Sequence, residues 1–279
     1  MITCTQRVLM EQHIAQLKNE GKKIGFVPTM GALHDGHISL VERARRENDI
    51  VVASIYVNPL QFNNPNDLKK YPRVPEKDLQ LLQDACCDLV FMPDDAIIGD
   101  SKGFNYNIGY FDTIMEGFHR PGHFKGVAFI VKTFFEIVQP NKAYFGEKDY
   151  QQLAVIKKMV KDFGLPVSII PCPTVREPNG LAMSSRNARL TEDEKQSAAG
   201  IFEGLIYIKN NIFSQKPEVL KEWFVKNIQN HPGMQVEYIE LCDSENLTPV
   251  TEVKESASVV ACTAVYLRNV RLIDNLKIF

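Results

Sequence analysis

Short, unbroken apolar segments recur along the chain as far as residue 171, and segments with helical periodicity separate them. The predicted strands are 24–30, 49–58, 88–93, 142–146 and 166–171. Apolar runs without polar alternation are typical of a parallel sheet that is covered on both faces. Helices are predicted at 6–20, at 37–48, from Pro75 onward, at 126–138 and at 150–164. This alternation predicts an α/β fold with a Rossmann-like parallel sheet built from right-handed βαβ units.

Two of the predicted helices carry visible apolar stripes. In the helix at 6–20, the residues Val8, Leu9, Ile14 and Leu17 fall on one side, and Gly21 follows its end. In the helix at 126–138, apolar residues recur at helical spacing throughout. Both helices are therefore expected to be amphipathic.

The pattern changes after residue 176. A polar loop at 177–190 is followed by a predicted helix over 192–208, for which Thr191 and Glu194 form a capping box. Another helix is predicted from Pro217 to about 229, and antiparallel strands are predicted at 234–243, 256–267 and 270–274. We therefore predict two domains, a Rossmann-like domain at 1–176 and a smaller α+β domain at 177–279.

Composition excludes several classes of function. The chain has 279 residues, with 32 Lys and Arg against 34 Asp and Glu, so its formal net charge is −2. That balance argues against nucleic acid and an anionic membrane as partners. The sequence has no apolar run of about 18 residues and no signal-peptide pattern at its start, so no membrane span is predicted. The 6 cysteines form no C-x-x-C pair and are expected to be buried apolar residues of a reduced, cytoplasmic protein.

The segment PTMGALHDGH (28–37) lies between a predicted strand and a predicted helix. The start of a helix presents unpaired amides and the positive end of its dipole, which suits a phosphate. His34 and His37 are three apart and can donate to phosphate oxygens from the same side. Gly36 lets a ligand approach the backbone. The alternative is a turn whose histidines only cap the helix.

A second pair of histidines occurs in FHRPGHF (118–124). A cationic loop that supports substrate binding could be formed here by His119, Arg120, His123 and Lys125. Pro121 and Gly122 prevent the helical spacing that zinc-binding pairs of histidines use. The alternative is a polar loop with hydrogen-bonded histidines.

Three further polar segments follow predicted strands or lie at the domain boundary: VNPLQFN (57–63), FGEKDYQQ (145–152) and LAMSSRN (181–187). Open α/β sheets bind ligands at the carboxyl ends of their strands. Lys148 and Arg186 suit phosphate, and Ser184 and Ser185 add donors. Asn58 and Gln61 could orient a small polar substrate without adding charge. The chain lacks a Walker A sequence, G-x-G-x-x-G, H-E-x-x-H and G-x-S-x-G.

Taken in order, these segments resemble the pantoate–β-alanine ligase family. The matching segments are PTMGALHDGH, VNPLQF, YPR (71–73), RPGHF (120–124), FGEKDYQQ, NGLAMSSRN (179–187) and RLIDN (271–275). FGEKDYQQ and AMSSRN are specific to this family, whereas HDGH alone is shared with the wider HxGH nucleotidyltransferase group. In that wider group the second motif is usually rich in lysine, and MSSR replaces it here as in this family.

The resemblance implies an ATP-dependent condensation of (R)-pantoate with β-alanine to give pantothenate, AMP and diphosphate. The reaction would pass through pantoyl adenylate on the route to coenzyme A. The resemblance also implies a Rossmann-type N-terminal domain, a C-terminal lid, a homodimer and Mg-ATP.

Individual residue roles follow from the same resemblance. His37 would donate a proton, and the catalytic set would be His37, His34, Lys148, Ser184, Ser185 and Arg186. The ATP site would comprise Met30, Gly31, Ala32, Leu33, His34, Asp35, Gly36, His37, Gly146, Glu147, Lys148, Asp149, Val175, Met183, Ser184, Ser185 and Arg186. Gln61 would bind pantoate beside the β-alanine position, Gln152 would bind pantoate, and Asn58 would assist. Asp78 is a candidate to contact Mg²⁺ through water.

Three alternatives remain at the level of sequence. The first is another HxGH adenylyltransferase, which would transfer AMP to a phosphopantetheine or a mononucleotide. The second is a regulator that binds ATP without chemistry. The third is a metal site formed by the paired histidines.

Non-covalent adenylation needs no side-chain nucleophile, which agrees with the absence of a G-x-S-x-G sequence.

Overall fold

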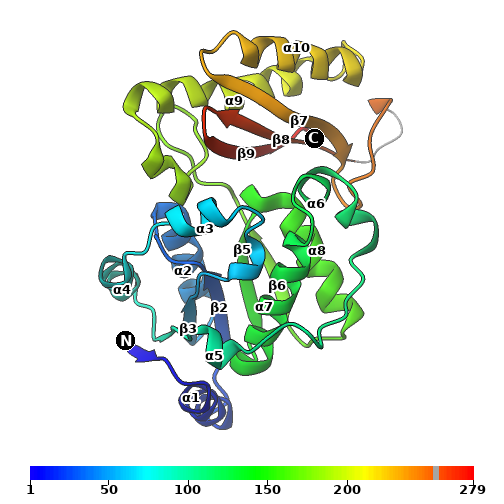
Figure 1. The fold of residues 1–279 in the computed structure, drawn as a ribbon. Coiled ribbons are helices and arrows are strands. Elements are labelled where there is room, and N and C mark those ends of the chain that lie inside the picture. The colour runs from blue at the N-terminus through cyan, green and yellow to red at the C-terminus, as the bar shows by residue number, and fades with distance from the viewer. Residues whose placement is uncertain (254–257) are drawn as a thin grey trace. The chain divides into compact units, whose positions relative to one another are not determined.

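The computed structural model describes residues 1–253 and 258–279 (Figure 1). Internal contacts divide the chain into two compact units. Unit 1 comprises 1–147 and 155–173, and unit 2 comprises 148–154 and 174–279. The domain boundary at 176 and 177 stays a prediction.

Unit 1 is built on a parallel sheet of six strands in the order β1-β4-β3-β2-β5-β6. The strands are β1 (Ile2–Cys4), β2 (Ile24–Thr29), β3 (Ile50–Ile55), β4 (Leu89–Phe91), β5 (Lys142–Gly146) and β6 (Ser168–Cys172). The chain moves outward from β2 to β3 and β4, and then returns to place β5 on the other side of β2. The direction of winding thus reverses between β2 and β5, and ligands bind at such switch points in open α/β sheets.

Helices cover both faces of this sheet. The helices of this part of the chain are α1 (Arg7–Asn19), α2 (Asp35–Glu47), α3 (Pro65–Lys70), α4 (Pro75–Asp84), α5 (Asp95–Ile98), α6 (Met115–His119), α7 (His123–Val138) and α8 (Tyr150–Asp162). Val41 of α2 and Leu82 of α4 pack with Val27 and Val51 on one face. On the other face, the Phe134 ring of α7 lies 5.9 Å from Phe26. Because neighbouring residues of a strand point to opposite faces, Phe26 and Val27 serve the two cores. Unbroken apolar strands follow from this double burial.

Unit 2 contains an antiparallel sheet in the order β7-β8-β9. Its strands are β7 (Met234–Asp243), β8 (Val259–Leu267) and β9 (Val270–Lys277), and its helices are α9 (Glu192–Asn211) and α10 (Pro217–Gln229). Figure 1 shows α9 and α10 side by side over the sheet, and Leu205 and Phe224 are fully buried in their shared core. The Thr191–Glu194 capping box opens α9 as the sequence predicts.

The α/β fold class is confirmed, and several local predictions need correction. Residues 256 and 257 of the predicted strand 256–267 lie outside the described residues, and β9 runs to Lys277, beyond the predicted end. In α1 the buried residues are Met10 and Ile14, whereas Val8 is 62% exposed. The stripe through Val8 and Leu9 was wrong because Met10 and Ile14, one helical turn apart, define the buried side.

The segment 118–124 also differs from its prediction as one polar loop. His119 ends α6, Gly122 turns the chain with a φ of 81°, and His123 begins α7, earlier than the predicted start at 126. His123 is only 6% exposed. Sequence periodicity missed this start because His123 is polar but buried.

Five of the six cysteines are buried, and Cys86 is exposed. Burial raises the pKa of the Cys87 and Cys242 thiols to about 12. Cys86 is exposed because it follows α4 at a turn, where its φ is 57°. No helix among the described residues has both the length and the apolar character needed to cross a membrane.

Candidate active site

The loop after β2 begins with a sharp turn of the backbone. The Thr29 hydroxyl donates to the Ser54 carbonyl at 2.6 Å and accepts from the Gly31 amide at 3.2 Å. Gly31 has a φ of 78°, and a side chain there would begin 2.9 Å from an Asp78 oxygen. Ala32 follows with a φ of 51°. A left-handed backbone is uncommon for a residue other than glycine, so other groups must hold Ala32 and this loop in place.

Asp78 of α4 supplies that support. Its carboxylate accepts from the Ala32 amide at 2.9 Å and from the Leu33 amide at 2.7 Å. The residue is 1% exposed. Charge-assisted bonds of this kind are about twice as strong as neutral ones. Asp78 therefore fixes the backbone of the predicted phosphate loop.

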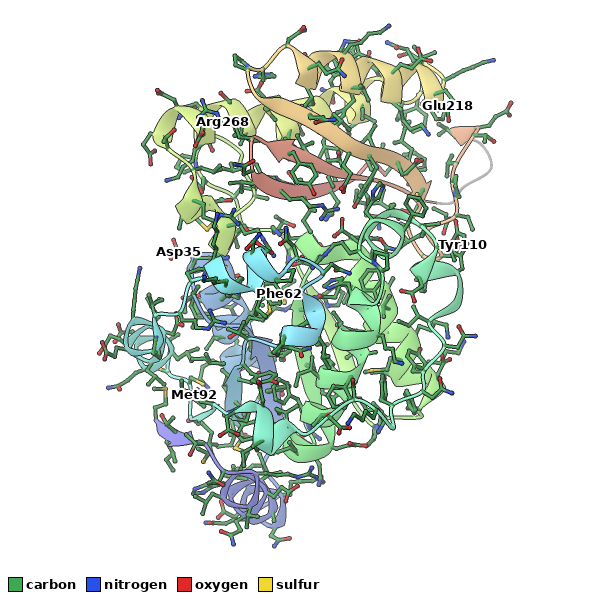
Figure 2. All side chains as sticks on the ribbon, viewed as in Figure 1. Asp35, Phe62, Met92, Tyr110, Glu218 and Arg268 are labelled. Carbon is green, nitrogen blue, oxygen red and sulfur yellow. The ribbon has the colours of Figure 1, made fainter. Side chains whose placement is uncertain are left out.

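His34 and His37 open α2 as a reciprocal cap. Nδ1 of His34 accepts from the Gly36 amide at 3.1 Å, and Nδ1 of His37 accepts from the His34 amide at 3.4 Å. The two rings lie 4.1 Å apart, and Asp35, the first residue of the helix, is labelled in Figure 2. Because each Nδ1 accepts a hydrogen bond, the proton of each neutral ring is on Nε2. Each ring can then donate to a ligand through Nε2.

A second loop of unit 1, after β3, carries Asn58 and Gln61. Pro59–Gln61 forms a short 3-10 helix (η1), for which Asn58 is the N-cap. The Asn58 side chain accepts from the Leu60 amide at 3.2 Å, donates to the Gly126 carbonyl at 3.0 Å and is 1% exposed. A side chain at Gly126 would clash with the Leu60 carbonyl, so α7 approaches this loop closely.

The His119–His123 segment contacts the same loop. His123 Nδ1 lies 2.9 Å from the Gln61 carbonyl oxygen, and Arg120 donates to that oxygen at 3.1 Å. Because a carbonyl can only accept, His123 must donate through Nδ1. Arg120 is also paired at 3.1 Å with the buried Glu116. These residues fix the main chain at Gln61, which gives the segment a structural role beside a predicted substrate contact.

An open cleft of about 770 Å³ lies next to the first loop within unit 1. Met30, Gly31 and Asp78 line it together with Arg73 and with Met92, and Figure 2 labels Met92. The cleft thus reaches the start of the loop, at Met30 and Gly31.

In unit 2, residues 175–183 fold back as a hairpin, and the predicted residues Ser184, Ser185 and Arg186 follow it directly. The Met183 amide donates to the Val175 carbonyl at 3.0 Å, and Arg176 pairs with Ala182. Ser184 caps the following 3-10 helix, Ser185–Arg189 (η4), through the Arg186 amide at 3.2 Å. Asn187 is buried and donates to Glu177 at 2.9 Å and to the Ala182 carbonyl at 3.1 Å. The backbone of this segment is therefore an ordered, hydrogen-bonded turn.

Lys148 lies in a 3-10 helix, Glu147–Asp149 (η3), just after β5. Its Nζ is 3.8 Å from Asp149, and its side chain is 17% exposed. Its carbonyl accepts from the Asn275 side chain at 2.8 Å.

The predicted site residues are divided between the two units, and their grouping into one site stays a prediction. In unit 1 these are Met30 to His37, Asn58, Gln61, Asp78, Gly146 and Glu147, and in unit 2 they are Lys148, Asp149, Gln152, Val175 and Met183 to Arg186. Sequence reasoning assigned no role to Arg176, Asp274 or Asn275. Asn275 contacts Lys148, and Arg176 contacts both Asp274 and Asn275. The available signal was the Asp-Asn pair in the segment RLIDN.

The sequence profile described as pantoate-beta-alanine ligase matches residues 2–277. The chain belongs to the pantoate–β-alanine ligase family. Pantothenate synthetase from Cytophaga hutchinsonii is 47% identical to this chain over 281 residues, which cover 100% of this chain and 99% of the relative. The relative from Porphyromonas gingivalis is 46% identical over 269 residues and covers 96% of each chain.

Solved structures agree with this assignment. The crystal structure of pantothenate synthetase from Thermus thermophilus is 39% identical to the ligase, with a TM-score of 0.92 and 100% of both chains covered. Pantoate-beta-alanine ligase from Francisella tularensis, solved with beta-gamma ATP and β-alanine, is 38% identical, with a TM-score of 0.83 over 100% of this chain and 98% of that chain. The predicted family is confirmed, and the ligase is favoured over another HxGH adenylyltransferase.

Proposed function

We propose that the ligase condenses (R)-pantoate with β-alanine through a pantoyl adenylate, and that the loop at 30–37 binds the phosphates of ATP. One observation carries the second part: the loop presents two imidazoles and a helix start at the carboxyl end of β2, beside β5, where the sheet reverses its winding. Such a position suits an anionic ligand on general grounds.

The reaction takes two steps. A pantoate carboxylate oxygen attacks the α-phosphorus of ATP, the bond to the bridging oxygen breaks, and diphosphate leaves with that electron pair. The amine of β-alanine then attacks the acyl carbon, loses a proton, and AMP leaves as the amide bond forms. Every bond is made between substrates, so no side-chain nucleophile is needed.

His34 and His37 serve the first step as neutral donors. Their Nδ1 atoms accept from backbone amides, so a second proton on either ring would break the cap. Nε2–H of each ring donates to phosphate oxygens as charge develops on them. In histidine ¹⁵N spectra of the resting enzyme, both rings should give the shifts of the Nε2–H tautomer at pH 7.

Further residues are proposed as ATP contacts, and each unit is taken by itself. In unit 1, the backbone of Met30 to Gly36 and residues Gly146 and Glu147 contribute. In unit 2, Lys148 and Arg186 neutralise phosphate charge, and Ser184 and Ser185 donate hydrogen bonds. Asp149, Val175 and Met183 complete the ATP site.

Pantoate would contact Gln61 and Gln152, with β-alanine beside Gln61. The amide groups of these glutamines can bind a hydroxyl or a carboxylate without adding charge. Asn58 is assigned a positioning role, because its amide already bonds the backbone at Leu60 and Gly126. His123 and Arg120 hold the Gln61 main chain from the other side.

Mg²⁺ would enter as part of its ATP complex. The described residues contain no group of three or more His, Cys, Asp or Glu side chains that could hold a metal. Mg²⁺ keeps several waters and binds substrate phosphates in such sites, so the residues present fit an ion carried by ATP. Asp78 supports the loop backbone through both of its oxygens, and its contact with Mg²⁺ through water stays a prediction.

The ligase is further proposed to act as a homodimer in the cytoplasm. The six cysteines form no disulfide, which suits a reducing compartment. Sedimentation equilibrium of the purified chain measures the subunit number directly.

The deciding experiment measures ATP consumption with each acid alone and with both. Pantoate alone should release diphosphate and leave enzyme-bound pantoyl adenylate, and AMP should be released only when β-alanine is added. Release of AMP with β-alanine alone, or transfer of AMP to a phosphopantetheine or mononucleotide, would overturn the proposal. ATP binding without turnover in the presence of both acids would instead support the regulator.

A further inference from the structure

A buried polar network of unit 2 connects two segments that carry predicted ATP contacts. Its centre is the Arg176 guanidinium, which pairs with Asp274 of β9 through two bonds of 2.6 and 2.9 Å. Asp274 is 5% exposed and the Arg176 side chain 16% exposed. Such a two-bond pair fixes orientation as well as distance.

The remaining donors of Arg176 hold the hairpin. The guanidinium bonds the Gly180 carbonyl at 3.0 Å and the Asn275 carbonyl at 3.2 Å. It also lies 3.7 Å from the centre of the Phe202 ring. Arg176 thus sets the position of the turn that leads to Ser184, Ser185 and Arg186.

Asn275 extends the network to Lys148. Its side-chain amide carries no charge and donates from Nδ2 to the Lys148 carbonyl at 2.8 Å, and its own backbone amide donates to Asp274 at 2.8 Å. Asn275 is 7% exposed. One strand residue therefore ties the main chain at Lys148 to the ion pair that holds the hairpin.

The free energy needed to bury the Arg176–Asp274 ion pair argues for a role beyond stability. Burial raises the pKa of Asp274, and Arg176 opposes that effect. A buried ion pair of this kind is often no more stabilising than well-packed apolar residues. What it offers here is fixed geometry for two segments that lie far apart in the sequence.

We propose that Arg176, Asp274 and Asn275 are positioning residues for adenylation. They hold Lys148, and the hairpin that leads to Ser184, Ser185 and Arg186, in one fixed arrangement. This inference rests on the proposed function of Lys148. A displacement of about 1 Å at such a contact can cost about a hundredfold in rate.

The test is a double-mutant cycle between Asn275→Ala and Lys148→Ala, read as single-turnover formation of pantoyl adenylate. Asn275→Ala alone should slow this step about tenfold to a hundredfold. In the Lys148→Ala background it should change the rate less than about twofold, because the ammonium it positions is gone. Asn275→Ala should lower the urea midpoint equally in both backgrounds, because Asn275 bonds the main-chain oxygen of residue 148, which Lys148→Ala keeps.

Glu237→Gln is the matched control. Glu237 pairs with Arg271 of the same strand as Asn275, β9, at 2.5 Å, and the two side chains are 18% and 17% exposed. This variant should lower stability but leave adenylation within about twofold of wild type. If Asn275→Ala does not fold, Asn275→Asp replaces it in the cycle, because aspartate keeps the shape of the side chain but loses the Nδ2 donor to Lys148.

Additive rate effects of Asn275→Ala and Lys148→Ala would overturn the inference, as would equal rate losses in Asn275→Ala and Glu237→Gln. If the wild-type chain forms no adenylate from pantoate and ATP, the proposed function fails first. Wild-type activity together with an unaffected Asn275→Ala variant would refute the positioning role alone.

Discussion

Asp78→Asn offers a sharp test of how the phosphate loop is held. The carboxylate accepts from the Ala32 and Leu33 amides at 2.9 and 2.7 Å in a buried position. An asparagine of the same shape can accept only one of these bonds, and its NH₂ group then faces the other amide. A hydrogen bond to a charged group contributes about 1.5–3 kcal/mol, so the variant should lose about 3 kcal/mol of unfolding free energy. That is within the total stability of an ordinary domain, so the variant should fold.

The Asp78→Asn substitution should also slow the reaction. Ala32 and Leu33 directly precede His34, so a relaxed loop moves the imidazoles away from the phosphates. Turnover should fall by about a hundredfold. The Mg²⁺ concentration for half-maximal rate should change less than about twofold, because both Asp78 oxygens are already bonded to the backbone.

The assay combines urea unfolding, followed by circular dichroism, with steady-state rates over a range of Mg²⁺ concentrations. Asp84→Asn is the control, because Asp84 lies on the same helix and bonds the Gln80 side chain at the surface. Wild-type stability in Asp78→Asn, combined with a raised Mg²⁺ requirement, would refute the loop-holding argument and favour a metal contact.

Four further outcomes are expected. Lys148→Ala should slow adenylation by about 10²–10³-fold, whereas supplied pantoyl adenylate should react with β-alanine near the wild-type rate; equal damage to both steps would remove Lys148 from phosphate chemistry. His123→Ala should raise the KM for pantoate about tenfold more than the KM for ATP, because it releases the Gln61 carbonyl, and unchanged pantoate kinetics would contradict this. Iodoacetamide at pH 7 should modify Cys86 before the buried thiols and leave turnover intact, as mass spectrometry with a rate assay can show. Lys142 and Arg43 lower the pKa of Glu47 from 4.5 to about 2, so Glu47→Gln should cost about 1 kcal/mol at pH 7, and urea unfolding should show that difference disappear as pH falls from 4.5 to 2.

Local signals in the sequence predicted much of the fold. The apolar run at 49–58 became β3, and the Thr191–Glu194 capping box opens α9, because each depends on residues within one strand or one turn. The helix predicted at 37–48 is α2, which begins two residues earlier, at Asp35, because His34 caps it. The alternation of such elements was enough to predict an α/β fold.

Burial within an element was less predictable. The stripe of α1 through Val8 was wrong, and the buried His123 concealed the true start of α7. Which side of a helix is covered depends on the neighbouring elements, which the sequence of the helix does not specify.

The sequence predicted candidate functional segments, but not the groups that hold them. Asp78 bonds an amide 45 residues away, and Arg176 reaches Asp274 across 98 residues. No local period or motif spacing encodes such pairs, because the chain brings them together only when the sheets form. By itself the sequence determined which residues could bind phosphate. Tertiary structure decided which of their backbone positions are fixed, because hydrogen bonds between distant segments exist only in the folded chain.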